Sequence, residues 1–510
     1  MAEKKLSNSS VVARNSIFLA ARMVVVMLIS LFTTRFLLNN LGIEDYGVYN
    51  VTLGIVSMCT FLSPALSNAI QRYFNYELGK NGVNGAMKVF NASIQIQLLM
   101  IFVIILICET VGLWYILEKL VVPEGRGMAT LWVYQISVVA LSISMLQVPF
   151  VAAILAHERM GFYAMVNVLD AVLKLLIAIG IAFSNYDKLI FYGFLLLGIN
   201  ILNFLLYLLY SRKCFDEIRL QMNIDKPLLK GLLSFSGWNL FETIARVGKD
   251  QGGNLLLNFY FGPVLNAARG ITNQVTYAFS SIVDSTVMAS RPQMVISYAQ
   301  GNRERSLSMF YSLSKGTLIL LYMLSIPVFL DIEYILKLWI GTNIPAYSVE
   351  LIRLSIIMLL IDKLASPVTA LIHATGNVKR YHLLSGIVNI MVLPVAWFFF
   401  MLGYDPTSIY IIMIIGALIA QIVFLFVIKQ LMPFSLSIYL QKVCVPFFVV
   451  LMLSIWAPIL IKSLFLESFF RLLGIFLISL LVITIVTYLV ALSRDEKRLI
   501  QSLFNVQKFS

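Results

Sequence analysis

Fourteen apolar stretches run through the 510 residues of this chain, and each has about the 20 apolar residues that a helix needs to cross a bilayer. The chain is 60% hydrophobic and 12% charged, a composition far outside the range of soluble domains. The sequence therefore predicts an all-α, polytopic membrane protein. The predicted spans are 11–39, 46–71, 86–116, 129–156, 162–184, 189–210, 231–260, 264–290, 306–330, 346–372, 381–403, 407–430, 436–461 and 467–492.

Residues recur between the first six spans and the next six at a nearly constant spacing. Duplicated helical halves are how many transporters build a central site between two lobes, so the recurrence indicates a duplicated membrane transporter. The matched pairs are Gly42 with Gly262, at an offset of 220 residues, Tyr76 and Gly79 with Tyr298 and Gly301, at 222, and Pro149, Ala152, Ile154, Ala156 and Tyr163 with Pro367, Ala370, Ile372, Ala374 and Tyr381, at 218.

Each half has an even number of spans, so the two repeats are expected to have parallel topology. We expect an N-lobe over residues 1–210, a cytoplasmic linker over 211–230, a C-lobe over 231–431, and two added helices with a tail over 432–510. The linker carries five basic and three acidic residues. It fits a solvated loop and an amphipathic helix on anionic lipid equally well.

The distribution of Lys and Arg gives the expected orientation. With the N-terminus inside, the termini and inside loops hold 24 basic residues and the outside loops hold six, among them Arg126, Lys337 and Arg471. This bias predicts that both termini are cytoplasmic. The first apolar run is long enough to span, so we expect it to act as its own insertion signal.

The chain shows no pattern for a catalytic centre or a cofactor. Its four cysteines and three histidines have no paired spacing, so we expect neither a metal nor a disulfide. There is no GxxxxGK[ST] loop for ATP. The outside loops are too short for the acid-base and sugar-binding groups of a glycosyltransferase. We therefore expect a transporter without a cofactor, not an enzyme.

Eight basic residues fall inside the predicted spans. A charge at mid-membrane costs about 2.5–3.5 kcal/mol on insertion scales and usually faces a cavity or a partner. Some have carboxylates nearby in sequence, which favours ion pairs. Arg22, Arg35 and Arg269 have none three or four residues away and are the strongest candidates for contact with an anionic substrate, followed by Arg246 and Lys249. The other three are Lys174 beside Asp170, Arg353, and Lys363 beside Asp362.

Buried carboxylates are the expected site of ion coupling, since transport against a gradient needs an energy source. The candidates are Asp170, Asp250, Asp284 and Asp362. Spans two and eight also carry amides and hydroxyls, including Asn50 and Asn266, which suit either a wet surface or hydrogen bonds between helices.

The segment joining spans one and two reads Arg35-Phe-Leu-Leu-Asn-Asn-Leu-Gly-Ile-Glu-Asp-Tyr-Gly-Val-Tyr. Gly42, Tyr46, Gly47 and Tyr49 in it resemble the Leu-Gly, Tyr-Gly and Tyr pattern of polysaccharide-type exporters in the multidrug, oligosaccharidyl-lipid and polysaccharide superfamily. The runs that begin at Ala156 and Ala374 resemble the short cytoplasmic turns of that family. The resemblance covers nearly the whole chain.

The resemblance implies an inverted-V fold of two six-helix lobes around a cavity bounded by spans one, two, seven and eight. It implies a flippase in the bacterial inner membrane for a glycan on undecaprenyl pyrophosphate, an O-antigen or capsular repeat unit in a lipopolysaccharide or exopolysaccharide pathway. Coupling to H⁺ or Na⁺, and a polymerase or ligase partner, follow from it. Guanidinium groups suit a pyrophosphate. A multidrug exporter on the same fold and, with less support, a membrane glycosyltransferase or polymerase stay open.

Overall fold

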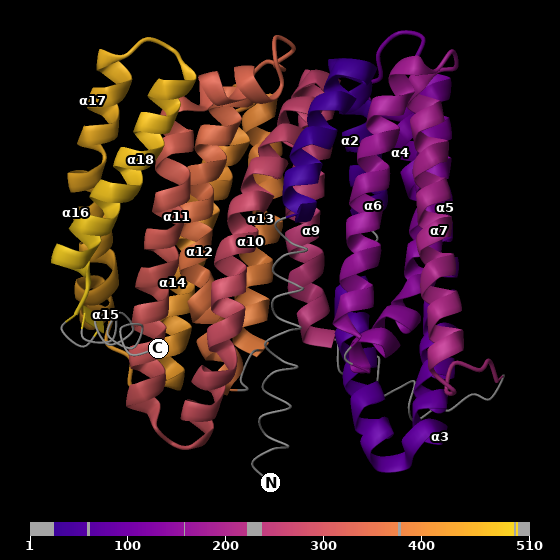
Figure 1. The fold of residues 1–510 in the computed structure, drawn as a ribbon, viewed down its shortest axis with the longest axis horizontal. Coiled ribbons are helices and arrows are strands. Elements are labelled where there is room, and N and C mark those ends of the chain that lie inside the picture. Colours follow the sequence, from indigo (N-terminus) through magenta and orange to yellow (C-terminus); the bar gives the residue numbers. More distant parts are fainter. Residues whose placement is uncertain are drawn as a thin grey trace, which may run out of the picture. The chain divides into compact units, whose positions relative to one another are not determined.

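The computed structural model describes residues 25–58, 62–157, 159–221, 237–375, 379–493 and 496–497. Every regular element in these ranges is a helix (Figure 1). Ten of the described helices are long and apolar enough to cross a membrane. A shorter apolar helix covers Val25–Leu41. The expected all-α fold with about 14 membrane helices is confirmed.

The chain divides into two compact units. The first comprises Met1–Ile271 and Asn389–Pro406, and the second comprises Thr272–Val388 and Thr407–Ser510. The division falls inside two helices, α10 (Pro263–Ala299) and α13 (Lys379–Met401). The expected lobes, with a linker over 211–230, stay a prediction.

The first unit holds the helix over Val25–Leu41 and the helices that follow it. They are α2 (Ile43–Ser57), α3 (Leu62–Ile107), the π-turn η2 (Cys108–Gly112), α4 (Leu113–Glu118), α5 (Gly127–Ala156), α6 (Met160–Gly180), the 3₁₀ turn η3 (Ile181–Phe183), α7 (Lys188–Cys214), α9 (Gly237–Phe261), the start of α10 and the end of α13.

The second unit continues α10 and ends with the chain. Its helices are α11 (Arg303–Trp339), α12 (Ser348–Thr375), the start of α13, α14 (Ser408–Leu431), α15 (Leu436–Tyr439), η4 (Leu440–Cys444), α16 (Val445–Ser454), α17 (Trp456–Leu464), α18 (Phe469–Val486) and η5 (Thr487–Ala491). Helices α10 and α11 run past the expected ends at 290 and 330, because each helix continues beyond its apolar run.

The two units use the same packing scheme. In the first, α5 packs against both α3 and α7, and in the second α12 packs against both α11 and α14. Ala152 and Ile154 lie in the first core, and their sequence matches Ala370 and Ile372 lie in the second. The matched residues therefore fill equivalent cores, as expected for a duplicated chain.

Glycines with positive φ mark equivalent breaks in the two halves. Gly42 (φ 86°) separates the helix Val25–Leu41 from α2, and Gly262 (φ 78°) separates α9 from α10. Glycine adopts this region without the strain that a Cβ brings. Gly301 (φ 78°) ends the turn after α10, whereas in the first half the positive φ lies at Gly82 (φ 62°), not at the sequence match Gly79.

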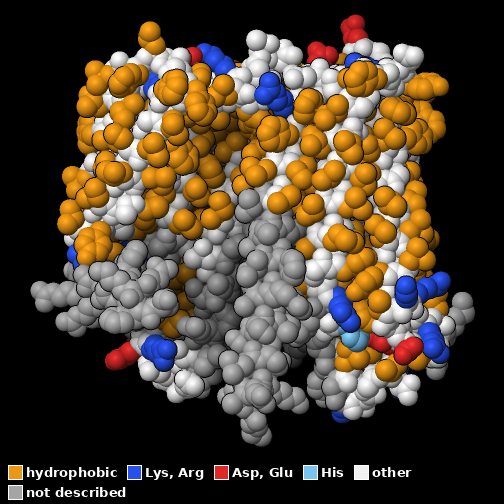
Figure 2. All heavy atoms as spheres, in the orientation of Figure 1, with side chains coloured by type: hydrophobic (Ala, Val, Ile, Leu, Met, Phe, Trp, Pro, Cys, Tyr) orange, Lys and Arg blue, Asp and Glu red, His pale blue; other side chains and the backbone are white. Residues whose placement is uncertain are grey.

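The surface has the pattern expected of helices in lipid. Figure 2 shows hydrophobic side chains over the outward faces of the helices and charged side chains near the helix ends. Phe102, Trp114, Phe426 and Phe470 are exposed. Because bilayer tails are as apolar as these side chains, such exposure is favourable in a membrane. Which end faces the cytoplasm stays a prediction.

Candidate functional site

A buried asparagine cluster joins α2, α9 and α10 in the first unit. The Asn258 amide nitrogen donates to Oδ1 of Asn266 at 3.0 Å, and the Asn266 amide nitrogen donates to both the backbone oxygen and Oδ1 of Asn254 at 2.8 Å. Asn254 in turn donates to the Asn50 carbonyl at 3.4 Å. These bonds fix three membrane helices to one another, because a broken amide bond in an apolar medium leaves a costly unpaired group.

The cluster also fixes the loop between α4 and α5. Asn258 accepts a hydrogen bond from the Val121 amide at 2.9 Å and donates to the Val121 carbonyl at 3.2 Å. The sequence analysis did not single out Asn254 or Asn258. Their spacing of four residues, which places both on one face of α9, is the signal that could have identified them.

Three glycines let these helices approach closely. A Cβ on Gly47 would lie 2.0 Å from the Pro263 carbonyl oxygen, and one on Gly270 would lie 2.9 Å from the Asn50 amide. A Cβ on Gly54 would lie 2.7 Å from Gln251. Gly47 belongs to the Tyr-Gly motif seen in the sequence, so the motif has a packing role here: only a residue without a side chain fits against the start of α10.

Among the four expected substrate-binding bases that the structure describes, Arg269 is the most buried. Its side chain is 4% exposed, and Nη2 donates to the Asp250 backbone carbonyl at 2.8 Å. This bond ties α10 to α9 beside the asparagine cluster. The structure therefore gives Arg269 a bracing role in the site and brings it together with Asp250.

The other bases differ in exposure. Arg35 is half-buried on the helix Val25–Leu41, Lys249 is half-buried on α9, and Arg246 is exposed on α9. Arg22 lies outside the described residues. Arg353, which the sequence analysis placed inside a span, lies near the start of α12 and donates to Glu333 at 3.1 Å.

Two of the expected coupling carboxylates are held by lysines, one in each unit. Asp170 on α6 accepts from Lys174 at 2.8 Å and from Asn203 on α7 at 2.8 Å. The expected pairing of Asp170 with Lys174 is confirmed. Asp284 on α10 accepts from the buried Lys363 at 2.7 and 2.8 Å.

The remaining two carboxylates are placed differently. Asp250 is half-buried on α9, and Asp362 is exposed on α12. The sequence had suggested Asp362 as the neighbour of Lys363, but the structure pairs that lysine with Asp284 through space.

A second charged cluster lies at the helix starts of the first unit. Arg126 Nε donates to Asp45 at 2.7 Å, and its guanidinium also pairs with Asp187, which caps α7 by accepting from the Leu189 and Ile190 amides. Asp45 is 17% exposed, whereas its neighbour Glu44 is exposed.

The two carboxyls of this cluster titrate differently. Burial raises the pKa of the Asp45 carboxyl above its usual value, although Arg126 acts in the opposite direction. Burial also acts to raise the pKa of Asp187, but the hydrogen bonds from Arg126 and the two amides outweigh it, so this pKa lies below its usual value. Arg126 thus joins the starts of α2, α5 and α7 at neutral pH.

In the described part of the chain, no group of three or more His, Cys, Asp or Glu side chains is placed to hold a metal ion. The structure thus shows a braced amide core on α2, α9 and α10. Arg35 lies on the helix Val25–Leu41, and α9 carries Arg246 and Lys249 together with Glu242 and Asp250.

No model of a known protein family matches this sequence, and no curated protein matches it. Solved structures do match. One is the lipid II flippase MurJ in an inward closed conformation, at 14% identity over 94% of this chain and 98% of that one, with a TM-score of 0.69. Another is an inward-facing multidrug resistance MATE family transporter of the MOP superfamily, at 15% identity over 82% and 98%, with a TM-score of 0.65.

A third match is a MOP superfamily transporter from Pyrococcus furiosus Vc1 (DSM3638), described as having a binding pocket of reverse polarity. It is 15% identical over 84% of this chain and 96% of that one, with a TM-score of 0.58. At these identities the likeness establishes the fold alone. The chain therefore has the all-helical fold of the MATE transporters and of MurJ.

Proposed function

We propose that this protein is a flippase that moves an undecaprenyl-pyrophosphate-linked oligosaccharide from the cytoplasmic to the periplasmic leaflet of a bacterial inner membrane. It works by alternating access and is coupled to H⁺ or Na⁺. The glycan is an O-antigen or capsular repeat unit, and a polysaccharide polymerase or ligase takes the product.

The observation that carries the proposal is the presence of two bases, Arg246 and Lys249, on α9, a helix that also carries Glu242 and Asp250. Asn254 and Asn258 fix one face of this helix, while Lys249 is half-buried and Arg246 exposed. Bases within a membrane helix are costly, and their usual reason is a polar cavity or an anionic ligand. A pyrophosphate is such a ligand, because guanidinium and ammonium groups form charge-assisted hydrogen bonds with its oxygens.

The likeness to MurJ over 94% of the chain supports a lipid-linked cargo. The likeness to MATE transporters supports the alternative of drug export on the same fold, and the bases Arg35, Arg246 and Lys249 are the residues that favour an anionic cargo over it. Arg35 and Lys249 are therefore the side chains whose removal separates the two functions.

Asp170 is the favoured coupling carboxylate. Its two oxygens hold Lys174 and Asn203, so it links α6 to α7. Protonation of this carboxyl removes the ion pair and one acceptor, and thereby loosens that link. Replacement of all four candidate carboxylates by Asn should abolish coupling; unchanged transport against a proton or sodium gradient in that variant would refute ion coupling at these positions.

The direct test is flipping of a fluorescent undecaprenyl-pyrophosphate oligosaccharide in proteoliposomes. We expect wild type to flip it and the variant Arg35→Gln/Lys249→Gln to lose about a hundredfold or more in rate, because each of the two lost charge-assisted phosphate contacts is worth about 1.5–3 kcal/mol. The matched control is Lys337→Gln, which removes an exposed base outside the site. Equal rates in all three proteins would exclude this anion site, and export of a cationic dye without flipping would favour the drug exporter.

A further inference from the structure

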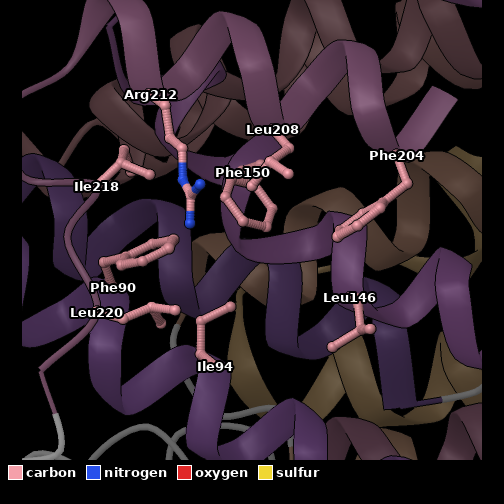
Figure 3. A pocket seen from close by; sticks show the side chains of 9 residues that line it. All are labelled: Phe90, Ile94, Leu146, Phe150, Phe204, Leu208, Arg212, Ile218 and Leu220. Carbon is pink, nitrogen blue, oxygen red and sulfur yellow. The ribbon is translucent and has the colours of Figure 1, made fainter. Parts of the chain in front are cut away.

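The first unit contains an apolar cavity that the proposed transport does not use. It lies where α3, α5 and α7 meet the segment 215–221, and its volume is about 240 Å³ (Figure 3). A water molecule takes about 30 Å³, so the cavity has room for roughly eight groups of that size. The lining residues are Phe90, Ile94, Leu146, Phe150, Phe204, Leu208, Arg212, Ile218 and Leu220.

Arg212 is the single charged group in this lining. It lies in the last turn of α7, a helix long and apolar enough to span. Figure 3 shows its side chain pointing from α7 into the ring of apolar side chains. It makes no hydrogen bond or ion pair with any residue that the structure describes. A guanidinium at the end of a span, with its donors unused by the protein, is placed to bind an anion at the membrane surface.

The segment after α7 closes the cavity on one side and is held there by specific contacts. The Asn91 side chain donates to the Arg219 carbonyl at 2.9 Å and accepts from the Gln221 amide at 2.6 Å. Glu217, 2% exposed, binds Nε2 of His157 at 2.5 Å. Leu220 and Ile218 thereby stay against the cavity as its wall. The segment 215–221 contains no helix, and Asp216 and Arg219 in it are exposed, so the expected linker over 211–230 stays a prediction.

We propose that this cavity binds one acyl chain of an anionic phospholipid, with the lipid phosphate on Arg212. The lining accepts only an apolar group, and its one charge requires a negative end on the same ligand. An anionic phospholipid has an apolar acyl chain and a negative headgroup in one molecule, and such headgroups gather near basic residues at the membrane interface. Its function is to anchor the cytoplasmic end of α7 and the segment 215–221 to the bilayer.

Photolabelling tests the site. The probe is phosphatidylglycerol with a diazirine on one acyl chain, incorporated into phosphatidylcholine liposomes with the intact protein, and the labelled peptides are mapped by mass spectrometry. We expect labels on the lining residues of α3, α5 and α7 that unlabelled phosphatidylglycerol removes by competition. Arg212→Gln should lower labelling about fivefold, the loss expected for one basic contact to an anionic lipid.

The matched control is Lys213→Gln, which removes the neighbouring exposed base outside the lining. It should label as wild type does. Ile94→Trp fills the cavity and should lower labelling while Arg212 is intact. Equal labelling in wild type and Arg212→Gln, an equal loss in Lys213→Gln, or equal labelling by a phosphatidylcholine probe would overturn the proposal. If Ile94→Trp does not fold, the comparison of Arg212→Gln with Lys213→Gln decides.

Discussion

The buried ion pair between Asp331 and Arg471 should be the costliest polar contact to break in the second unit. The Arg471 guanidinium donates to both carboxylate oxygens of Asp331, at 2.5 and 3.3 Å, and the two side chains are 7% and 2% exposed. Asp331 lies at a kink in α11, with φ −116° and ψ 28°. The pair attaches the start of α18 to this kink.

Asp331→Ala leaves the guanidinium buried without its counter-charge. Removal of one partner from such a pair costs about 3–5 kcal/mol, whereas replacing both with apolar residues is neutral or stabilising by about 1–4 kcal/mol. We therefore expect Asp331→Ala to lower the free energy of unfolding by about 3 kcal/mol or more, and Asp331→Leu/Arg471→Leu to restore it. The assay is equilibrium unfolding in mixed detergent micelles, followed by helical circular dichroism.

The control for this prediction is Lys337→Ala, which breaks an exposed pair with Glu467, 2.8 Å long, on the same helix α11. The side chains of Lys337 and Glu467 are 57% and 44% exposed, so Lys337→Ala should lower the free energy of unfolding by only about 0–1 kcal/mol. An Asp331→Ala cost below about 1 kcal/mol, or one equal to that of Lys337→Ala, would refute the reasoning. The same holds if the double leucine variant is no more stable than Asp331→Ala.

Three further predictions follow from the contacts. Gly47→Ala should lower the free energy of unfolding by about 1–3 kcal/mol and slow flipping, because the added Cβ would clash with the Pro263 carbonyl. Its control is Gly161→Ala, which has open space around the added Cβ and should be neutral in the same unfolding assay. Asn266→Leu should lower the free energy of unfolding by about 1–3 kcal/mol by leaving partners in the asparagine cluster unsatisfied, as measured by thermal unfolding with the exposed-site variant Asn84→Leu as control. Burial acts to raise the pKa of Glu496, but hydrogen bonds from Lys315, the Ser493 amide and Ser312 lower it to about 2. The pairing of Glu496 with Lys315 should therefore contribute fully to stability above about pH 4.5 and be lost as the pH falls toward about 2. Amide hydrogen exchange at Ser493, Glu496 and Lys497 should report this loss.

The apolar runs predicted the helices because the bilayer requires about 20 apolar residues whatever the partners are. Gly42 and Gly262 were likewise visible as matched positions, and both turn out to separate helices. Contacts between distant residues were not visible. The sequence found the pair Asp170 with Lys174, four residues apart, but the partner of Arg471 lies 140 residues away and that of Lys363 lies 79 away.

The same limit explains why the partner of Arg471 was not predicted. The sequence analysis counted Arg471 among the outside-loop bases, and the structure buries its side chain against Asp331 of α11. Periodicity within one helix reports partners at three or four positions, and says nothing of which helices pack together. The role of Arg269 was missed for the same reason, since its acceptor is a backbone carbonyl on α9 and carries no side-chain signature.

The repeat predicted from the sequence relates the attachment point of α18 to a position in the first half of the chain. At the offset of 222 residues that relates Tyr76 to Tyr298, Asp331 corresponds to Glu109. Both acids lie where a long helix departs from α geometry, in the π-turn η2 after α3 and at the kink of α11. In the first unit Glu109 accepts from Gln135 of α5 at 3.0 Å, whereas in the second unit Asp331 holds Arg471 of α18.

Glu109 and Asp331 thus lie at comparable helix distortions but have different partners. Glu109 pairs with a neutral amide, whereas Asp331 pairs with the guanidinium of Arg471 on α18. If this account is right, the variant Glu109→Ala should cost little, because its partner is a neutral amide that water or lipid headgroups can satisfy, in contrast to the buried guanidinium left by Asp331→Ala. Measuring the free energy of unfolding of Glu109→Ala and Asp331→Ala in one experiment compares an acid that binds a neutral amide with an acid that binds the buried guanidinium of α18. Equal costs would show that the distortion itself, and not the pairing with α18, makes the acid necessary.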